Sequence, residues 1–90
     1  MKSEKILRLV SLYRQKLIER GVKNVPYHDK VTLISLNHSL EYCYGMLDRV
    51  EEVINEEKIT EAHHCLGFIQ GIFWANMVYT FADFEKHNTE

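Results

Sequence analysis

The sequence is poor in the residues and runs that mark disulfide-rich, membrane-spanning or secreted chains. Its 90 residues include two cysteines, one proline, four glycines and one tryptophan. No apolar stretch approaches the roughly 20 residues that cross a bilayer. The start, Met1 to Lys5, leads into an amphipathic pattern rather than a signal-peptide core. We therefore expect no membrane segment and a cytoplasmic location. We expect Cys43 and Cys65 to be buried thiols, with a disulfide as the alternative.

Motifs for metal, phosphate-loop or nucleophilic chemistry are also missing. There is no CxxC or HxxxH spacing. His63, His64 and Cys65 are consecutive, so on a helix they point about 100° apart and do not surround one ion. Gly67 and Gly71 fall inside a helical pattern rather than in a phosphate-binding loop. The acids in the middle of the chain are spaced like a solvated face, not like a catalytic carboxylate pair. We predict no metal site, no cofactor and no enzymatic activity.

Charge is divided unevenly along the chain. Residues 1–30 hold eight Lys or Arg and three acids, a net charge of +5, whereas residues 31–90 hold three Lys or Arg and ten acids, a net charge of −7. Either the basic end packs near an acidic surface of the protein, or it receives an anionic ligand. The isoelectric point near 6.2 argues against duplex DNA as a partner, because DNA-binding domains usually carry a clear positive excess.

Hydrophobic periodicity predicts an all-α fold in a single domain, residues 1–90, with three main helices and a short C-terminal one. The first helix is expected over residues 3–20, ended by Gly21, and the second from Thr32 to about residue 57. The third should cover residues 60–76 with Asn76 as a left-handed terminator, and the last residues 81–87 behind a Thr80–Asp83 capping box. The expected inward faces are Ile6, Leu9, Val10, Tyr13, Leu17 and Ile18 in the first helix, and Leu33, Leu36, Leu40, Cys43, Leu47, Val50 and Ile54 in the second.

The third helix carries the most informative stretch, an almost unbroken apolar run from Leu66 to Trp74. Gly67 and Gly71 fall on one face, and each costs about 1 kcal/mol of helix propensity relative to alanine. That cost suggests close packing by another helix, and the apolar circumference suggests burial on most sides. Three or four short helices can hardly surround such a helix. The sequence therefore predicts a homo-oligomer.

The junction between the first two helices is the strongest candidate site. Lys30 precedes the expected start of the second helix and Thr32 stands at it, where free N–H groups and the helix dipole favour phosphate. Tyr13 offers a flat ring on which a base can stack. The ordinary readings remain open: Thr32 as a cap, Lys30 as a solvated side chain and Tyr13 as core.

The stretch from His64 to Trp74 also carries a resemblance, together with Tyr79-Thr80 and the ending Glu85-Lys86-His87-Asn88. It resembles a family of small phage proteins, the cyclic-oligonucleotide sponges that blunt the bacterial CBASS defence (anti-CBASS protein two). The resemblance continues upstream through His38-Ser39-Leu40 and Met46-Leu47-Asp48, and so covers residues 30 to 88.

The resemblance implies a phage protein of the host cytoplasm that sequesters cyclic dinucleotides such as cyclic GMP–AMP without cleaving them. It implies a hexamer of interlocked subunits with pockets shared between chains. It gives Tyr13 the role of stacking on a purine, with Tyr27 as the replacement candidate, and Lys30 and Thr32 the role of holding phosphates. Some members bind cyclic trinucleotides at a second site through an arginine. His64 stands at that position, which puts the second site in doubt because neutral imidazole is a poorer phosphate partner than guanidinium.

A different class of function is a small helical interaction protein that inhibits a host protein by direct contact. Its interface would be the acidic second helix or a set of exposed aromatic side chains. The candidates for that set are Tyr42, Tyr44, Trp74 and Tyr79.

Overall fold

The computed structural model describes residues 1–25 and 38–89. This part of the chain contains four helices, α1 (Ser3–Glu19), α2 (Ser39–Asn55), α3 (Ile59–Ala75) and α4 (Phe81–Thr89). The predicted all-α fold of three main helices and a short C-terminal one is thereby confirmed. The expected start of the second helix at Thr32 lies outside the described residues. None of the helices in the described ranges is long and apolar enough to cross a bilayer.

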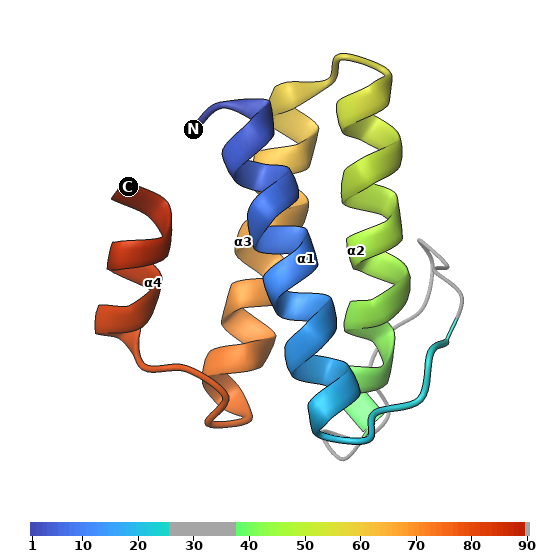
Figure 1. The fold of residues 1–90 in the computed structure, drawn as a ribbon, viewed down its shortest axis with the longest axis vertical. Coiled ribbons are helices and arrows are strands. Elements are labelled where there is room, and N and C mark those ends of the chain that lie inside the picture. The colour runs from blue at the N-terminus through green and yellow to red at the C-terminus, as the bar shows by residue number, and fades with distance from the viewer. Residues whose placement is uncertain (26–37, 90) are drawn as a thin grey trace.

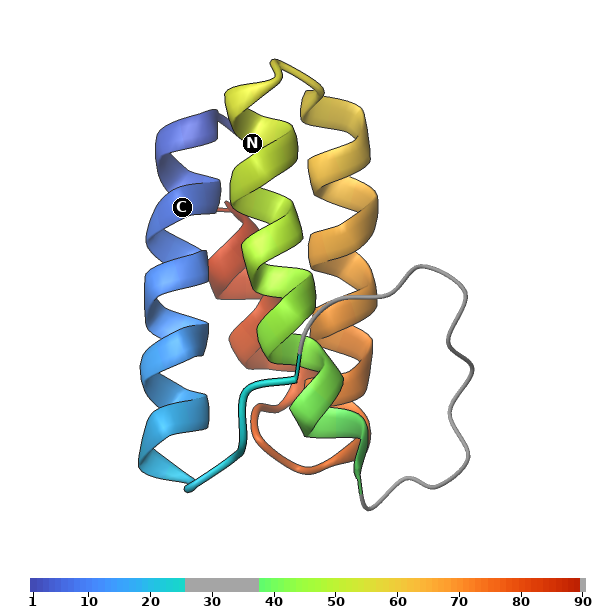
Figure 2. The same ribbon diagram turned by 90° about the vertical axis from the view of Figure 1, so that its right-hand side faces the viewer.

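The helices stand side by side around one core. α1 and α3 face each other, α2 covers one side of this pair, and the short α4 lies on the opposite side (Figures 1 and 2). α2 packs most extensively on α3, its antiparallel neighbour across a short connection. α4 lies alongside α1 and α3, away from α2 (Figure 2). This placement brings the end of the chain next to the middle of α1 and α3.

The core follows the helical period for the most part. One inward prediction, Ile18, is wrong, and Leu33 and Leu36 lie outside the described residues. Ile18 is 58% exposed, because it points away from the row that ends at Leu17 and lies in the last turn. Val53 is buried, and its neighbour Ile54 is only half-buried. The fully buried apolar side chains are Ile6, Val10, Tyr13, Leu17, Cys43, Leu47, Val50, Val53, Ala62, Ile69 and Phe73.

Each of the three long helices ends in a Schellman motif. Gly21, Glu57 and Met77 adopt left-handed backbone, with φ of 68°, 61° and 59°. The residue after each donates its N–H to a carbonyl five residues earlier, as Lys58 does to Val53. Only the first of these positions holds glycine, the residue that takes this conformation without steric cost. Two helix ends therefore store backbone strain.

Asn76 does not terminate α3 in the expected way. Its φ is −97°, and the following residue, Met77, takes the left-handed conformation. The Asn76 side chain instead donates from Nδ2 to the Ile72 carbonyl and to Ser39 Oγ, both at 2.8 Å. The amide thus ties the end of α3 to the start of α2. Asn76 therefore joins two helices through its side chain, instead of ending α3 with the left-handed backbone that asparagine favours.

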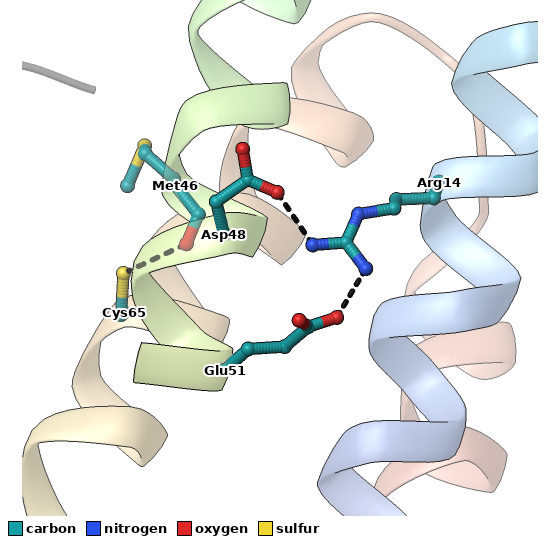
Figure 3. Close-up of polar contacts among 5 residues, drawn as sticks. All are labelled: Arg14, Met46, Asp48, Glu51 and Cys65. Carbon is teal, nitrogen blue, oxygen red and sulfur yellow. Dashed lines mark hydrogen bonds and ion pairs between the residues drawn. The ribbon is translucent and has the colours of Figure 1, made fainter. Parts of the chain in front are cut away.

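Ion pairs join the basic and acidic parts of the chain. The Arg14 guanidinium of α1 binds Asp48 and Glu51 of α2 (Figure 3). These pairs agree with the first interpretation of the uneven charge, in which the basic end of the chain packs against an acidic surface of the protein. The acid-rich end of α2 also meets cations: Arg49 pairs with glutamates 52, 56 and 61, and Lys58 pairs with Glu56. Because these groups are partly solvated, water screens the pairs and each adds little to the stability of the fold.

The capping box of α4 is confirmed. The Thr80 N–H donates to Asp83 Oδ2 at 2.9 Å, and the Asp83 N–H donates to Thr80 Oγ1 at 3.1 Å. The backbone and hydroxyl contacts of Thr80 hold the pKa of the Asp83 carboxyl below its usual value. Both bonds are local, so the start of α4 is fixed without help from the other helices.

We predict that Glu57→Gly stabilises the protein by about 1 kcal/mol, because left-handed backbone costs a side-chain-bearing residue about that much. Glu57 is exposed, so little packing is lost. The measurement is urea unfolding followed by circular dichroism. Gly21→Ala is the matched control and should destabilise the protein by a similar amount. Equal stability of Glu57→Gly and the parent would contradict the strain at this helix end.

Candidate functional site

The structure places two of the five candidate ligand residues. Tyr27, Lys30 and Thr32 lie outside the described residues. His64 is exposed on α3, and Tyr13 is fully buried on α1. Tyr13 and His64 are on opposite sides of α3. Tyr13 contacts the side of α3 that faces the core, and His64 is exposed on the other side. They do not form one site.

Tyr13 is the centre of a buried polar network that joins three helices. Its hydroxyl accepts a hydrogen bond from Gln70 Nε2 of α3 at 3.0 Å and lies 2.7 Å from His87 Nδ1 of α4. Because the oxygen already accepts from the amide, its proton is available for the imidazole nitrogen. Burial raises the pKa of the Tyr13 phenol well above its usual value, so the hydroxyl keeps this proton at neutral pH.

Gln70 extends the network to the last turn of α4. Its Nε2 donates to Asn88 Oδ1 at 2.8 Å, and its Oε1 accepts from Asn88 Nδ2 at 3.1 Å. The two amides thus form a reciprocal pair in which each gives one hydrogen bond and takes one. Gln70 is 8% exposed, and all of its polar atoms are used in these contacts. The network satisfies a polar side chain that α3 carries into the core.

Aromatic rings surround the same point. The Tyr13 ring centroid lies 5.0 Å from Phe73, 5.7 Å from Tyr79 and 5.5 Å from His87. The His87 ring in turn lies 4.9 Å from Tyr79 and 5.8 Å from Phe84. Lys16 Nζ stands 5.6 Å from the Tyr79 ring at the edge of the cluster. The exposed fraction of Tyr13 is 0%, so a base cannot stack on it while α4 holds this position.

Sequence reasoning did not identify Gln70, His87 and Asn88 as partners of Tyr13. Gln70 had a signal, because it is the one polar side chain in the apolar run from Leu66 to Trp74. A polar residue in such a run needs a partner in the core. The sequence did not indicate which residues that partner would be, since His87 and Asn88 are distant from Gln70 in sequence.

The described residues leave the outer face of α3 open, so the helices of one copy do not provide the close packing expected at the two glycines. We call this face the outer stripe; a side-chain atom added at Gly67 or Gly71 would meet none of the described residues within 4 Å. Phe68 is 60% exposed and Trp74 is 59% exposed. The other helices of the described residues cover only the inner side of α3, and burial of the remaining sides by further copies of the chain stays a prediction. The outer stripe consists of Thr60, His64, Gly67, Phe68, Gly71, Trp74 and Ala75.

The outer stripe carries almost no charge. Residues 62–82 contain no Asp, Glu, Lys or Arg. An exposed helix face in water is normally rich in such residues. Contiguous exposed apolar side chains on a small protein mark an interaction surface more often than a solvated one.

The two cysteines are free thiols and do not form the alternative disulfide; Cys43 is buried as expected, whereas Cys65 is only half-buried. Burial raises the pKa of Cys43 to about 12 and also raises that of Cys65. The Cys65 thiol points to the Met46 carbonyl at 3.6 Å (Figure 3). Both therefore stay protonated at neutral pH. Within residues 1–25 and 38–89, no three His, Cys, Asp or Glu side chains are grouped to hold a metal ion.

Comparison of the chain with protein-family models, with curated proteins and with solved structures finds no match.

We predict that Tyr13→Phe destabilises the protein by about 1–3 kcal/mol, because it removes two hydrogen bonds from a buried network. The ring and its packing are kept, so the loss reports the hydroxyl alone. Urea unfolding provides the measurement. Tyr42→Phe, at a half-buried position of α2, is the control and should change stability by less than about 0.5 kcal/mol. Equal effects of the two substitutions would show that the Tyr13 hydroxyl does not hold the helices together.

Proposed function

We propose that this chain is a non-enzymatic sponge that binds cyclic dinucleotides such as cyclic GMP–AMP as a homo-oligomer. The observation that carries the proposal is the outer stripe. The stretch that resembles the sponge family is the same stretch whose face is open, uncharged and apolar in the single chain. Covering that face with other copies removes apolar surface from water, which stabilises the assembly by about 25 cal/mol for each Å² buried. Pockets shared between chains, as the resemblance implies, require such contact.

A sponge acts by mass action. Each bound messenger is withdrawn from the pool that activates the host effector, and no bond of the messenger is broken. The protein must therefore be abundant and must bind more tightly than the effector does. Lys30 supplies charge for the phosphates, and Thr32 supplies a hydroxyl donor. Charge-assisted contacts of this kind are worth about 1.5–3 kcal/mol each.

The stacking role has two candidates with different requirements. Tyr27 is the first candidate, and it lies outside the described residues. Tyr13 takes the stacking role only when its cover in α4 is removed, because its ring is fully buried. A phage protein with either arrangement would work in the host cytoplasm and need no cofactor.

We predict that calorimetry detects binding of cyclic GMP–AMP and that the nucleotide is recovered intact after the complex is denatured. Lys30→Glu should weaken binding by at least 10-fold, since it replaces an attraction for phosphate by a repulsion. Lys23→Glu is the matched control: it makes the same charge change at an exposed position of the basic half and should have a much smaller effect. No heat with any cyclic dinucleotide would overturn the proposal, and recovery of a cleaved product would make the protein an enzyme.

We predict that the outer stripe joins copies of the chain. In an isolated chain, Gly67→Ala and Gly71→Ala should each stabilise α3 by about 1 kcal/mol, because the added methyl meets open space. In an oligomer packed through this face, the same methyl groups push the neighbouring copy away and shift the particle to a smaller mass. Light scattering after gel filtration distinguishes the two, with Ser11→Ala on the exposed side of α1 as control. A parent protein that is monomeric at all concentrations would contradict the proposal.

Inhibition of a host protein by direct contact is the second candidate, and it draws on the same exposed side chains. Trp74, Phe81 and Met77 are 59%, 69% and 88% exposed. Tyr44 is only 8% exposed and so does not serve as an interface residue in the described chain. Under this function Lys30→Glu leaves inhibition of the host protein intact, whereas a sponge loses its binding of cyclic dinucleotides with the same substitution.

A further inference from the structure

The last turn of α4 contacts the Tyr13 cluster in the manner of a bound base. His87 places a flat ring with a nitrogen 2.7 Å from the Tyr13 hydroxyl, among the rings of Tyr13, Tyr79 and Phe84. Asn88 places one donor and one acceptor side by side against the buried Gln70 amide. A purine offers the same two features, a flat nitrogen-containing ring and a polar edge beside it.

We infer that His87 and Asn88 occupy a nucleobase site on the inner side of α3, and that a purine base of the ligand displaces them. The site consists of Tyr13, Gln70, Phe73 and Tyr79. This inference rests on the proposed function, and it names the part of the messenger that this pocket takes. α4 is then the built-in occupant of the site.

The Gln70 amide selects the base. Held as it is, it presents one N–H donor and one carbonyl acceptor toward Asn88, at 2.8 and 3.1 Å. Adenine presents the complement, an N6 amino donor beside the N7 acceptor, and amide side chains bind adenine through this pair. The corresponding edge of guanine has two acceptors, O6 and N7, and leaves the Gln70 carbonyl opposite an acceptor. The pocket therefore takes adenine in preference to guanine through this edge.

α4 is suited to leave. Phe84 is the one buried side chain in its nine residues. Its Thr80–Asp83 capping box is local and survives undocking. A helix of nine residues is marginal alone, and a segment with few buried contacts opens at low cost. A base that stacks on Tyr13 gains contacts of the strength that α4 gives up, since stacking on an aromatic side chain is worth about 1–3 kcal/mol.

Displacement has a measurable consequence. A ligand that binds only the open form has its apparent dissociation constant raised by the inverse of the open fraction. Weakening the hold of α4 without touching the pocket therefore tightens binding. Asn88→Ala does this, because it removes both hydrogen bonds between the α4 side chain and the Gln70 amide. Gln70→Ala removes the same hydrogen bonds, but it also removes the amide that would hydrogen-bond the edge of the base.

The experiment compares the full-length parent, Asn88→Ala and Gln70→Ala in calorimetry with cyclic di-AMP and cyclic di-GMP. Glu85→Ala, at an exposed position of the same helix, is the control for helix propensity. We expect Asn88→Ala to bind cyclic di-AMP about 3- to 10-fold more tightly than the parent. We expect Gln70→Ala to lose the preference for cyclic di-AMP over cyclic di-GMP, and Glu85→Ala to behave like the parent.

Hydrogen exchange read by mass spectrometry supplies the second readout. Saturating cyclic di-AMP should speed the exchange of the amides of α4, while α2 stays as protected as before. If cyclic dinucleotides bind but α4 keeps its protection and Asn88→Ala leaves the affinity unchanged, this inference is overturned and the proposed function stands. If neither the parent nor Asn88→Ala binds any cyclic dinucleotide, the proposed function fails, and the base site fails with it.

Discussion

The hydroxyl of Tyr13 is the contact on which the arrangement of the helices depends. It accepts from Gln70 on α3 and lies within hydrogen-bond distance of His87 on α4, so one oxygen sets the positions of three helices. A buried polar group must be paired in full, because an unpaired one costs about 1–3 kcal/mol. This requirement fixes where α4 lies more strictly than its single buried side chain, Phe84, does.

The two sides of α3 have opposite characters, and both bear on function. The inner side uses Gln70 and Phe73 to build the Tyr13 cluster. The outer stripe is apolar and uncharged, and the part of the chain that the structure describes leaves it uncovered. A helix that is apolar all round in a four-helix chain has more surface to bury than its own neighbours provide. The same helix can thus support a ligand site within the chain and contact between chains.

Periodicity and local chemistry predicted the helices well, because these signals come from residues within one or two turns. Gly21 ends α1, and Thr80 with Asp83 starts α4, as their residue types favour. Long-range packing decided the exceptions. Met77 adopts the left-handed backbone instead of Asn76, whose amide is drawn to Ser39 on α2. For the candidate site, Tyr13 was identified and its place in the core was one of the two readings, but its partners Gln70 and His87 were not identified.

The sequence by itself determined the class of fold, the helix limits that are set locally, the free thiols and the surplus of apolar surface on α3. These properties follow from the spacing of apolar side chains and from residues that end or cap a helix. The tertiary structure alone decided which side of α3 is covered and what Tyr13 contacts. The physical reason is that Tyr13, Gln70 and Asn88 meet across 57 and 18 intervening sequence steps. No local pattern encodes such a meeting; only the packing of α4 against α1 and α3 brings it about.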